Sequence, residues 1–192
     1  MKTYLIGIAL MIATLAVAGC SSSGPERQAW RSPELDPRQF FSGLLCADGV
    51  VKGFSGEQIR QFNALIRASW DASGTGTLDE VFYFYDDKDQ PATEEKRVWT
   101  LKPVPEGYLA SATDVPDAAL MRYAGNTIHM AYTLRYGEPG DTIDLSMDDR
   151  MYQVADGVVV NETRMKKFGV EVGRILLVMR KVSDESQCAL PE

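Results

Sequence analysis

The thiol of Cys20 is the group whose surroundings most clearly specify a chemistry. It ends the segment Val17-Ala18-Gly19-Cys20, which closes an uncharged apolar run from Tyr4 to Ala18 that begins soon after Lys2. A basic start, an apolar run of this length and a small-residue end are typical of a secretory signal. The run is shorter than the roughly 20 residues that span a bilayer. The pattern predicts that residues 1–19 are a signal peptide that is removed.

The same segment resembles the bacterial lipobox, in which small residues give a peptidase access to the bond before a cysteine. The thiol takes a diacylglycerol, and the amine freed by cleavage takes another acyl chain. Stable anchoring requires at least two chains, so we expect lipidation of Cys20 to hold the protein in a membrane. The alternative is a plain signal peptide with an incidental cysteine. Ser21 stands where an Asp would favour the inner membrane, so we expect the outer membrane and a domain facing the periplasm.

Cys46 and Cys188 are the two cysteines that remain. An oxidising compartment favours a disulfide between them. Such a bond would tie the C-terminal tail to the first strand and stabilise the fold by up to about 5 kcal/mol in the chain-entropy model. Two free thiols that are never close remain the alternative.

Glu80 and Arg97 are the charged residues whose strand phase points inward. Glu80 alternates with Phe82 and Phe84, and Arg97 alternates with Trp99 on the next predicted strand. Because a lone buried charge is costly, we expect the two to form a buried pair. The pair could be structural, could anchor a ligand headgroup, or could act as catalytic acids, and the structural role is favoured.

Aromatic side chains on several predicted strands can line the interior of a barrel. Together with the charged pair they form a predicted ligand pocket. It consists of Trp70, Glu80, Phe82, Phe84, Arg97, Trp99, Tyr108 and Tyr132. The alternative is a filled core, which is common in small barrels.

Other chemistry has weak support in the sequence. The single histidine, His129, lies opposite the apolar phase of its strand, so we expect it to face solvent. No GxSxG nucleophile motif occurs. Asp144, Asp148 and Asp149 lack the spacing of a calcium loop, and Asp148 and Asp149 are expected in turns or hydrogen bonds. We therefore expect no enzyme activity, metal or cofactor.

The chain carries a net charge of −7. An acidic surface argues against nucleic-acid partners and against adhesion to anionic headgroups.

Short strands are the elements that must position these residues. The segment 126–137 alternates with period two, and 78–86, 97–101, 108–112, 141–147, 158–163 and 169–181 follow the same pattern. The segment 55–70 fits a capped helix or a strand, and the strand is favoured. A shift of phase near Gly173 predicts a bulge. No long helical pattern separates the strands, so the sequence predicts an all-β fold, an antiparallel meander closing into a lipocalin-like barrel.

The predicted organisation has four parts. Residues 1–19 are the signal peptide, 20–37 a lipidated flexible tether, 38–184 a single β-barrel domain and 185–192 a C-terminal tail. The Ser- and Pro-rich composition of the second part is typical of a flexible linker.

Short motifs along the chain resemble one family. They include Phe40-Phe41-Ser42-Gly43, Trp70-Asp71, Arg97-Val98-Trp99, Asp148-Asp149-Arg150-Met151-Tyr152 and Lys167-Phe168-Gly169-Val170. This pattern is similar to the proteobacterial lipoproteins of domain-of-unknown-function family 3833 over residues 38–181. The resemblance implies no mechanism, because the family has no established activity.

A looser likeness to lipocalins concerns architecture alone. The leading functional hypothesis is a non-catalytic module that binds an apolar or lipid-like ligand at the outer membrane. The alternative is an envelope interaction or assembly protein with a filled barrel, and an enzyme is the third candidate.

Overall fold

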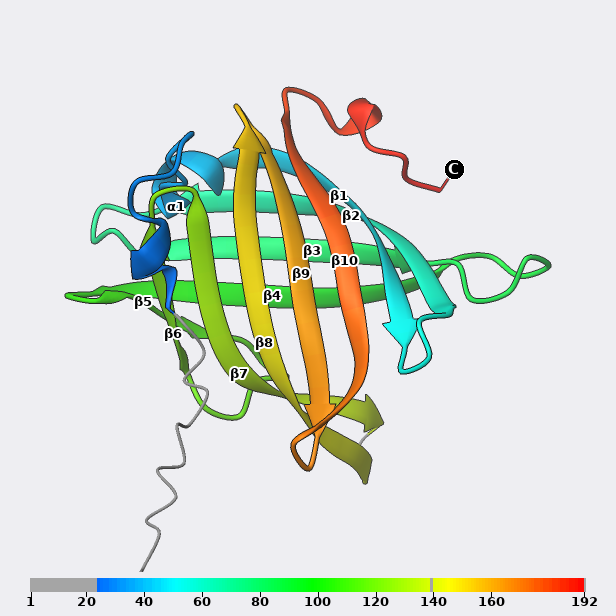
Figure 1. Ribbon diagram of the computed structural model, residues 1–192. Helices are drawn as coiled ribbons and strands as arrows, with labels where there is room; N and C mark the ends of the chain where they lie inside the picture. The colour runs from blue at the N-terminus through cyan, green and yellow to red at the C-terminus, as the bar shows by residue number, and fades with distance from the viewer. Residues whose placement is uncertain (1–23, 139, 192) are drawn as a thin grey trace, which may run out of the picture.

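Ten antiparallel strands form a closed barrel in the computed structural model, which describes residues 24–138 and 140–191 (Figure 1). Each strand pairs with its neighbours in sequence, and β1 pairs with β10 to close the wall. The strands are β1 Gly43–Gly53, β2 Gln58–Trp70, β3 Gly76–Phe84, β4 Thr93–Val104, β5 Gly107–Ser111, β6 Ala119–Ala124, β7 Thr127–Glu138, β8 Asp141–Ala155, β9 Val158–Lys167 and β10 Val170–Val182. The predicted all-β meander that closes into a barrel is confirmed.

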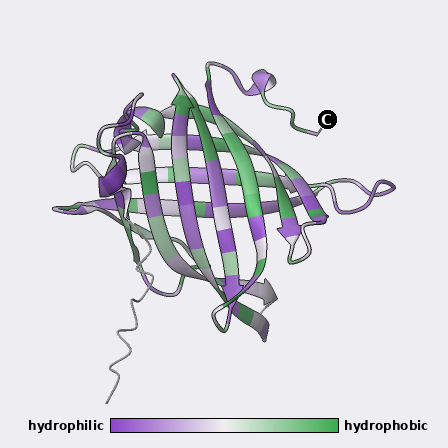
Figure 2. Ribbon diagram, in the orientation of Figure 1, coloured by the Kyte–Doolittle hydropathy of each residue, from purple (hydrophilic) through white to green (hydrophobic). Residues whose placement is uncertain are grey.

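Alternation of side chains determines which face of each strand points inward. Figure 2 shows this alternation as bands of opposite hydropathy along the strands. In β7, Ile128 and Met130 are buried in the core, and His129 between them points to the outer wall. Tight turns then reverse the chain, as at Asp156-Gly157, where Gly157 has a φ of 66°. Such two-residue turns join adjacent antiparallel strands, so the chain order becomes the strand order.

Several strand predictions are refined by the structure. The ambiguous segment 55–70 contains strand β2 rather than a helix, and the register shifts between Glu171 and Gly173 as predicted. Strand β8 continues to Ala155, so Asp148 and Asp149 lie in a strand and not in a turn, but the expected alternative, that they form hydrogen bonds, is confirmed. The short β6 was not predicted, because its six residues carry little alternation.

The segment before the barrel is packed rather than free. It contains a 3₁₀ helix, η1 Pro25–Gln28, and Leu35, which is completely buried and donates its backbone N–H to Gly125 O at 2.8 Å. Gly125 has a φ of 52°, and a Cβ there would lie 1.9 Å from Gln28 O. The prediction of a flexible tether through residue 37 is therefore wrong from residue 24 onward. Cys20 and the predicted signal peptide lie outside the described residues.

One end of the barrel is closed by the helix α1 Pro37–Phe40 (Figure 1). Phe40, the last residue of this helix, and Phe41, which follows it, are both buried. The Lys181 ammonium group donates to three backbone carbonyls of this region, those of Gln39, Phe40 and Ser42, at 2.9, 2.8 and 2.6 Å. The cation thereby supplies hydrogen-bond donors to carbonyl groups at the end of α1 and just after it, where a helix leaves carbonyls without intrahelical partners.

A disulfide joins Cys46 in β1 to Cys188, just after the 3₁₀ helix η2 Glu185–Gln187. This is the pairing that the sequence favoured, and it holds the C-terminal tail against the first strand. Within the described part of the chain, no helix has the length and apolar character needed to cross a membrane.

Candidate ligand-binding cavity

The barrel encloses a cavity of about 440 Å³. Its mouth lies at the end opposite α1, where the β1–β2, β3–β4, β7–β8 and β9–β10 connections gather, and Phe41 contributes to its floor. Most of its wall is apolar, and its volume falls within the range of small-molecule sites, about 300–1,000 Å³. The alternative of a filled barrel is therefore wrong.

Six of the eight predicted pocket residues line this cavity: Glu80, Phe82, Phe84, Arg97, Trp99 and Tyr132. Trp70 and Tyr108 do not, and their assignment is corrected. Their rings lie 5.3 Å apart at the closed end, and Trp70 Nε1 donates to Phe41 O at 2.6 Å. Strand phase predicts which residues point inward but carries no information about depth along the barrel. The two aromatics therefore face inward but belong to the packed closed end of the barrel.

Arg97 pairs with a residue that the sequence did not indicate. Glu80 faces Arg97 in register, yet the Arg97 guanidinium binds Asp114 Oδ2, with Nη2 at 2.6 Å and Nε at 2.8 Å. Asp114 lies in the β5–β6 loop, which the Arg135 N–H holds by donating to Asp114 O at 2.8 Å. The predicted Glu80–Arg97 ion pair is therefore wrong, because a loop distant in sequence supplies the better-placed carboxylate.

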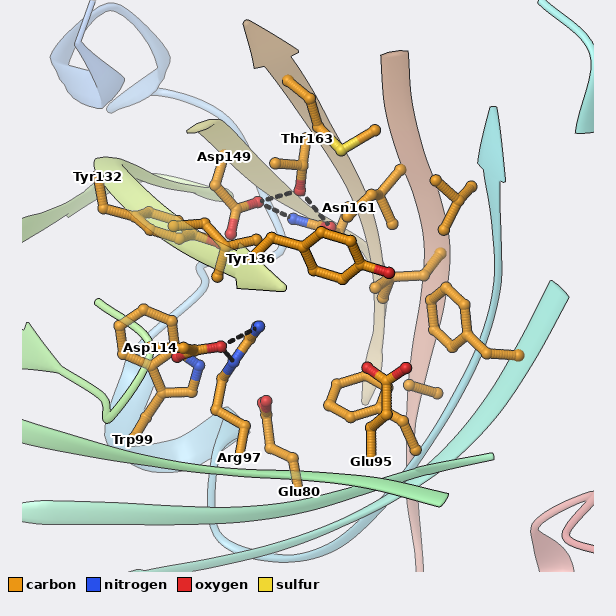
Figure 3. A pocket seen from close by; sticks show the side chains of 18 of the residues that line it. Glu80, Glu95, Arg97, Trp99, Asp114, Tyr132, Tyr136, Asp149, Asn161 and Thr163 are labelled. Atoms are coloured by element: carbon orange, nitrogen blue, oxygen red, sulfur yellow. Dashed lines mark hydrogen bonds and ion pairs between the residues drawn. The ribbon is translucent and has the colours of Figure 1, made fainter. Parts of the chain in front are cut away.

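Glu80 is left buried in the cavity wall (Figure 3). Among the described residues, no hydrogen bond reaches its carboxyl group. Burial raises the pKa of Glu80 to about 7; the positive charge of Arg97 opposes this shift, and the negative charges of Asp149 and Asp114 add to it. Near neutral pH this carboxyl group is therefore present in both its protonated and its ionised form.

A second polar group comes from β8 and β9 and was missed by the sequence interpretation. Thr163 Oγ1 donates to Asp149 Oδ1 at 3.0 Å, and Asn161 Nδ2 donates to the same oxygen. Burial raises the pKa of Asp149, although these two hydrogen bonds oppose the shift. Asp149 lies in phase with Leu145, which also lines the cavity, so alternation could have found it had the predicted strand been extended beyond residue 147.

His129 lies on the outer wall, away from the cavity, but the prediction that it faces solvent is wrong. The residue is only 4 % exposed, and its Nε2 lies 2.8 Å from Asp148 Oδ1. Arg122 and Arg150 are its neighbours across the two flanking strands. Long neighbouring side chains can cover an outward residue, and alternation alone does not reveal this.

The first polar group is Glu80, Arg97 and Asp114, and the second is Asp149, Asn161 and Thr163. Together they form a belt at mid-depth in the cavity, which we call the polar belt. Apolar side chains lie on both sides of it, with Trp99 and Met130 toward the closed end and Leu134 and Leu145 toward the mouth. Asp114 Oδ1 is buried and has no hydrogen-bond partner within the described residues. The belt therefore offers unfilled acceptors inside an apolar chamber.

Metal coordination has no candidate site in residues 24–138 and 140–191, where no three His, Cys, Asp or Glu side chains gather closely enough to hold an ion. The belt instead offers hydrogen-bond acceptors and one guanidinium group that is already paired.

Comparison of this sequence with known protein families identifies one family to which it belongs. The family described as "Protein of unknown function (DUF3833)" matches residues 14–181. This chain belongs to DUF3833. No curated protein matches the chain. Among solved structures, an S-type phycobiliprotein lyase from Guillardia theta is similar, with 7 % identity and a TM-score of 0.48, over 76 % of this chain and 91 % of that one.

Proposed function

We propose that this DUF3833 protein binds an amphiphile, with its apolar chain in the cavity and its headgroup at the polar belt. The observation that carries the proposal is a chamber of about 440 Å³ in which Glu80 and Asp114 Oδ1 are buried without hydrogen bonds from described residues. A buried acceptor without a donor is destabilising by about 1–3 kcal/mol. A ligand that donates hydrogen bonds at this depth would remove that penalty.

The charges of the polar belt indicate which chemical class of ligand headgroup can bind there. Three carboxyl groups face one guanidinium group, and Arg97 is already paired with Asp114. An anionic headgroup would meet like charges in a low-dielectric chamber and would leave the acceptors unfilled. A headgroup with hydroxyl or ammonium donors fits instead.

The two apolar regions orient the ligand. The region toward the closed end is densely packed around Ile128 and Met130, whereas the mouth side carries Leu134, Leu145 and the aromatic pair Phe82 and Phe84. The chain of the amphiphile therefore lies toward the mouth, and its headgroup enters first. Arg60 stands at the mouth, paired with Asp86 and Glu95 at 2.7 and 3.0 Å.

The test is a headgroup series on one chain length. Decylamine, decanol and decanoate are titrated into the purified protein by calorimetry at pH 6 and pH 8. We expect the amine to bind most tightly and decanoate most weakly. Amine binding should strengthen at pH 8, because Glu80 loses its proton as the pH passes its pKa of about 7.

Glu80→Gln provides the decisive variant. It should reduce the preference for amine over alcohol by about tenfold, or roughly 1.4 kcal/mol, and should abolish the pH dependence. Asp79→Asn is the matched control, because it removes the same charge from the adjacent, outward-facing position of β3. Failure of all three compounds to bind would refute ligand carriage. Tightest binding of decanoate would refute the headgroup class alone.

We further propose that lipid on Cys20 anchors the domain to the outer membrane, facing the periplasm. The support is the sequence pattern around Cys20 and the predicted secretory signal before it. Cys20→Ser should abolish incorporation of labelled palmitate and release the protein from the membrane fraction. Continued labelling of the variant would exclude this anchor.

A further inference from the structure

Two neighbouring hairpin tips at the cavity mouth expose phenylalanine side chains. Phe168, at the β9–β10 turn, is 93 % exposed, and Phe54, at the β1–β2 turn, is 79 % exposed. Because β1 pairs with β10 and Gly53 faces Gly173, the two hairpins stand side by side (Figure 1). Val170 adds further exposed apolar surface. Large apolar side chains gathered on protruding turns mark an interaction surface.

Lysines that form no ion pair with a described carboxylate accompany these tips, although Lys167 Nζ donates to the backbone carbonyl of Asp144 at 2.8 Å. Residues 164–174 contain four basic residues, Arg164, Lys166, Lys167 and Arg174, and one acidic residue, Glu171. Neither Lys166 nor Lys167 forms an ion pair with a described carboxylate, and neither does Lys52 beside the other tip. Lys167 Nζ lies 4.8 Å from the centre of the Phe168 ring. The net charge of −7 argues against anionic surfaces for the chain as a whole, but this hairpin is locally positive.

We propose that the β1–β2 and β9–β10 tips dock on the surface of a bilayer that contains anionic lipids. The phenylalanine rings enter the boundary between headgroups and acyl chains, and the lysines meet the anionic headgroups. Single aromatics on separate turns suit insertion among lipids better than a flat protein interface, which needs a continuous core. The acidic loop 86–89 occupies another side of the mouth, so the barrel would tilt its basic side toward the membrane.

This inference goes beyond the proposed function, since it rests on the tips alone. If the cavity also binds an amphiphile, docking would bring its mouth to the bilayer and would shorten the path of an apolar chain through water.

The test places a reporter at the tip of the full chain. Phe168→Trp is mixed with vesicles of phosphatidylcholine, with or without phosphatidylglycerol, whose acyl chains carry bromine. Val154→Trp is the control, because Val154 is exposed and lies near the C-terminal end of β8, away from the cavity mouth. Because the chain already contains Trp30, Trp70 and Trp99, the readout at each position is the fluorescence of the variant minus that of the unsubstituted chain, and this difference also removes any contribution from attachment of the N-terminus to the vesicle. We expect a blue shift and quenching at position 168 with phosphatidylglycerol, and neither at position 154.

Removal of two charges completes the test. The double variant Lys166→Gln and Lys167→Gln should weaken the response of the Phe168→Trp chain to anionic vesicles by roughly 10- to 30-fold. Equal quenching at positions 154 and 168, or equal responses to both vesicle types, would overturn the proposal. A blue shift without vesicles that grows with protein concentration would also overturn it, because a second copy would then be the partner.

Discussion

At the scale of single residues, Glu80 shows how the barrel maintains an acid that does not help it fold. Its carboxyl group is buried and receives no hydrogen bond from described residues, so ionisation is disfavoured in the folded state. Asp149 differs, because Asn161 and Thr163 both donate to it. A buried acid without such donors weakens the fold when it ionises, which is the arrangement expected of a group retained for binding.

The stability of the protein should therefore depend on the proton of Glu80. Its pKa is about 7 in the folded chain, above the ordinary 4.5. The folded state then binds more protons than the unfolded state between these values, so the free energy of unfolding falls as the pH rises from 4.5 to 7. Glu80→Gln should remove this fall, which amounts to about 3 kcal/mol. Urea unfolding at pH 4.5, 6 and 8 measures it, with Asp79→Asn as control. Parallel pH profiles of parent and Glu80→Gln would contradict the assignment.

At the scale of elements, the segment of residues 24–36 is part of the domain. It covers β6 and β7 near the closed end, where Leu35 is buried and Glu26 lies 3.4 Å from Arg122. Composition suggested a linker because Ser, Pro and polar residues dominate the stretch. The segment is nevertheless packed, because Leu35 and Pro25 are buried and Gly125 leaves room for the backbone at Gln28.

Truncation of that leucine should show the contribution of the segment. Leu35→Ala removes a completely buried side chain, and we expect a loss of about 2–5 kcal/mol in the free energy of unfolding. Trp30→Ala in the same segment is the control, because Trp30 is 75 % exposed and its loss should have little effect. Urea denaturation compares the two. Similar small effects of both changes would mean that the segment adds nothing to the fold.

At the scale of the whole molecule, closure of the wall creates the chamber. Ten strands surround more volume than their inward side chains fill, and α1 closes only one end. The packed region at the closed end supplies most of the core, and a smaller apolar group near the mouth leaves space. The closed half of the barrel therefore contributes most of the packing that stabilises the fold, and the mouth half leaves the space for the proposed ligand.

Filling the mouth half should separate these two roles. Leu145→Trp places a larger ring beside the proposed chain of the ligand, and we expect decylamine and decanol to lose at least tenfold in affinity together. Overpacking should lower stability by no more than about 1–3 kcal/mol. Ser146→Trp, on the outer face of β8, is the control. Calorimetry and urea unfolding report both quantities. Unchanged affinity for Leu145→Trp would place the ligand elsewhere.

Some inward-facing residues of the barrel could be predicted from the sequence, and others could not. Period-two alternation correctly placed Glu80, Phe82 and Phe84 on the inner face, because strand phase is a local property. It also placed Trp70 and Tyr108 on the inner face, but strand phase does not indicate how far along the barrel an inward side chain lies. Asp114 could not be found, since its contact with Arg97 depends on a loop that reaches across the barrel.

The class of fold, the meander order of the strands and the inward face of most of them, though not of β6, can be inferred from sequence alone. These follow from alternation and tight turns, which act over a few residues. Three outcomes depend on the folded barrel: the acid that partners Arg97, the hollow interior, and the packing of residues 24–36 against the wall. Such outcomes depend on distances between residues far apart in the chain, and these are settled when the β1 and β10 edges meet.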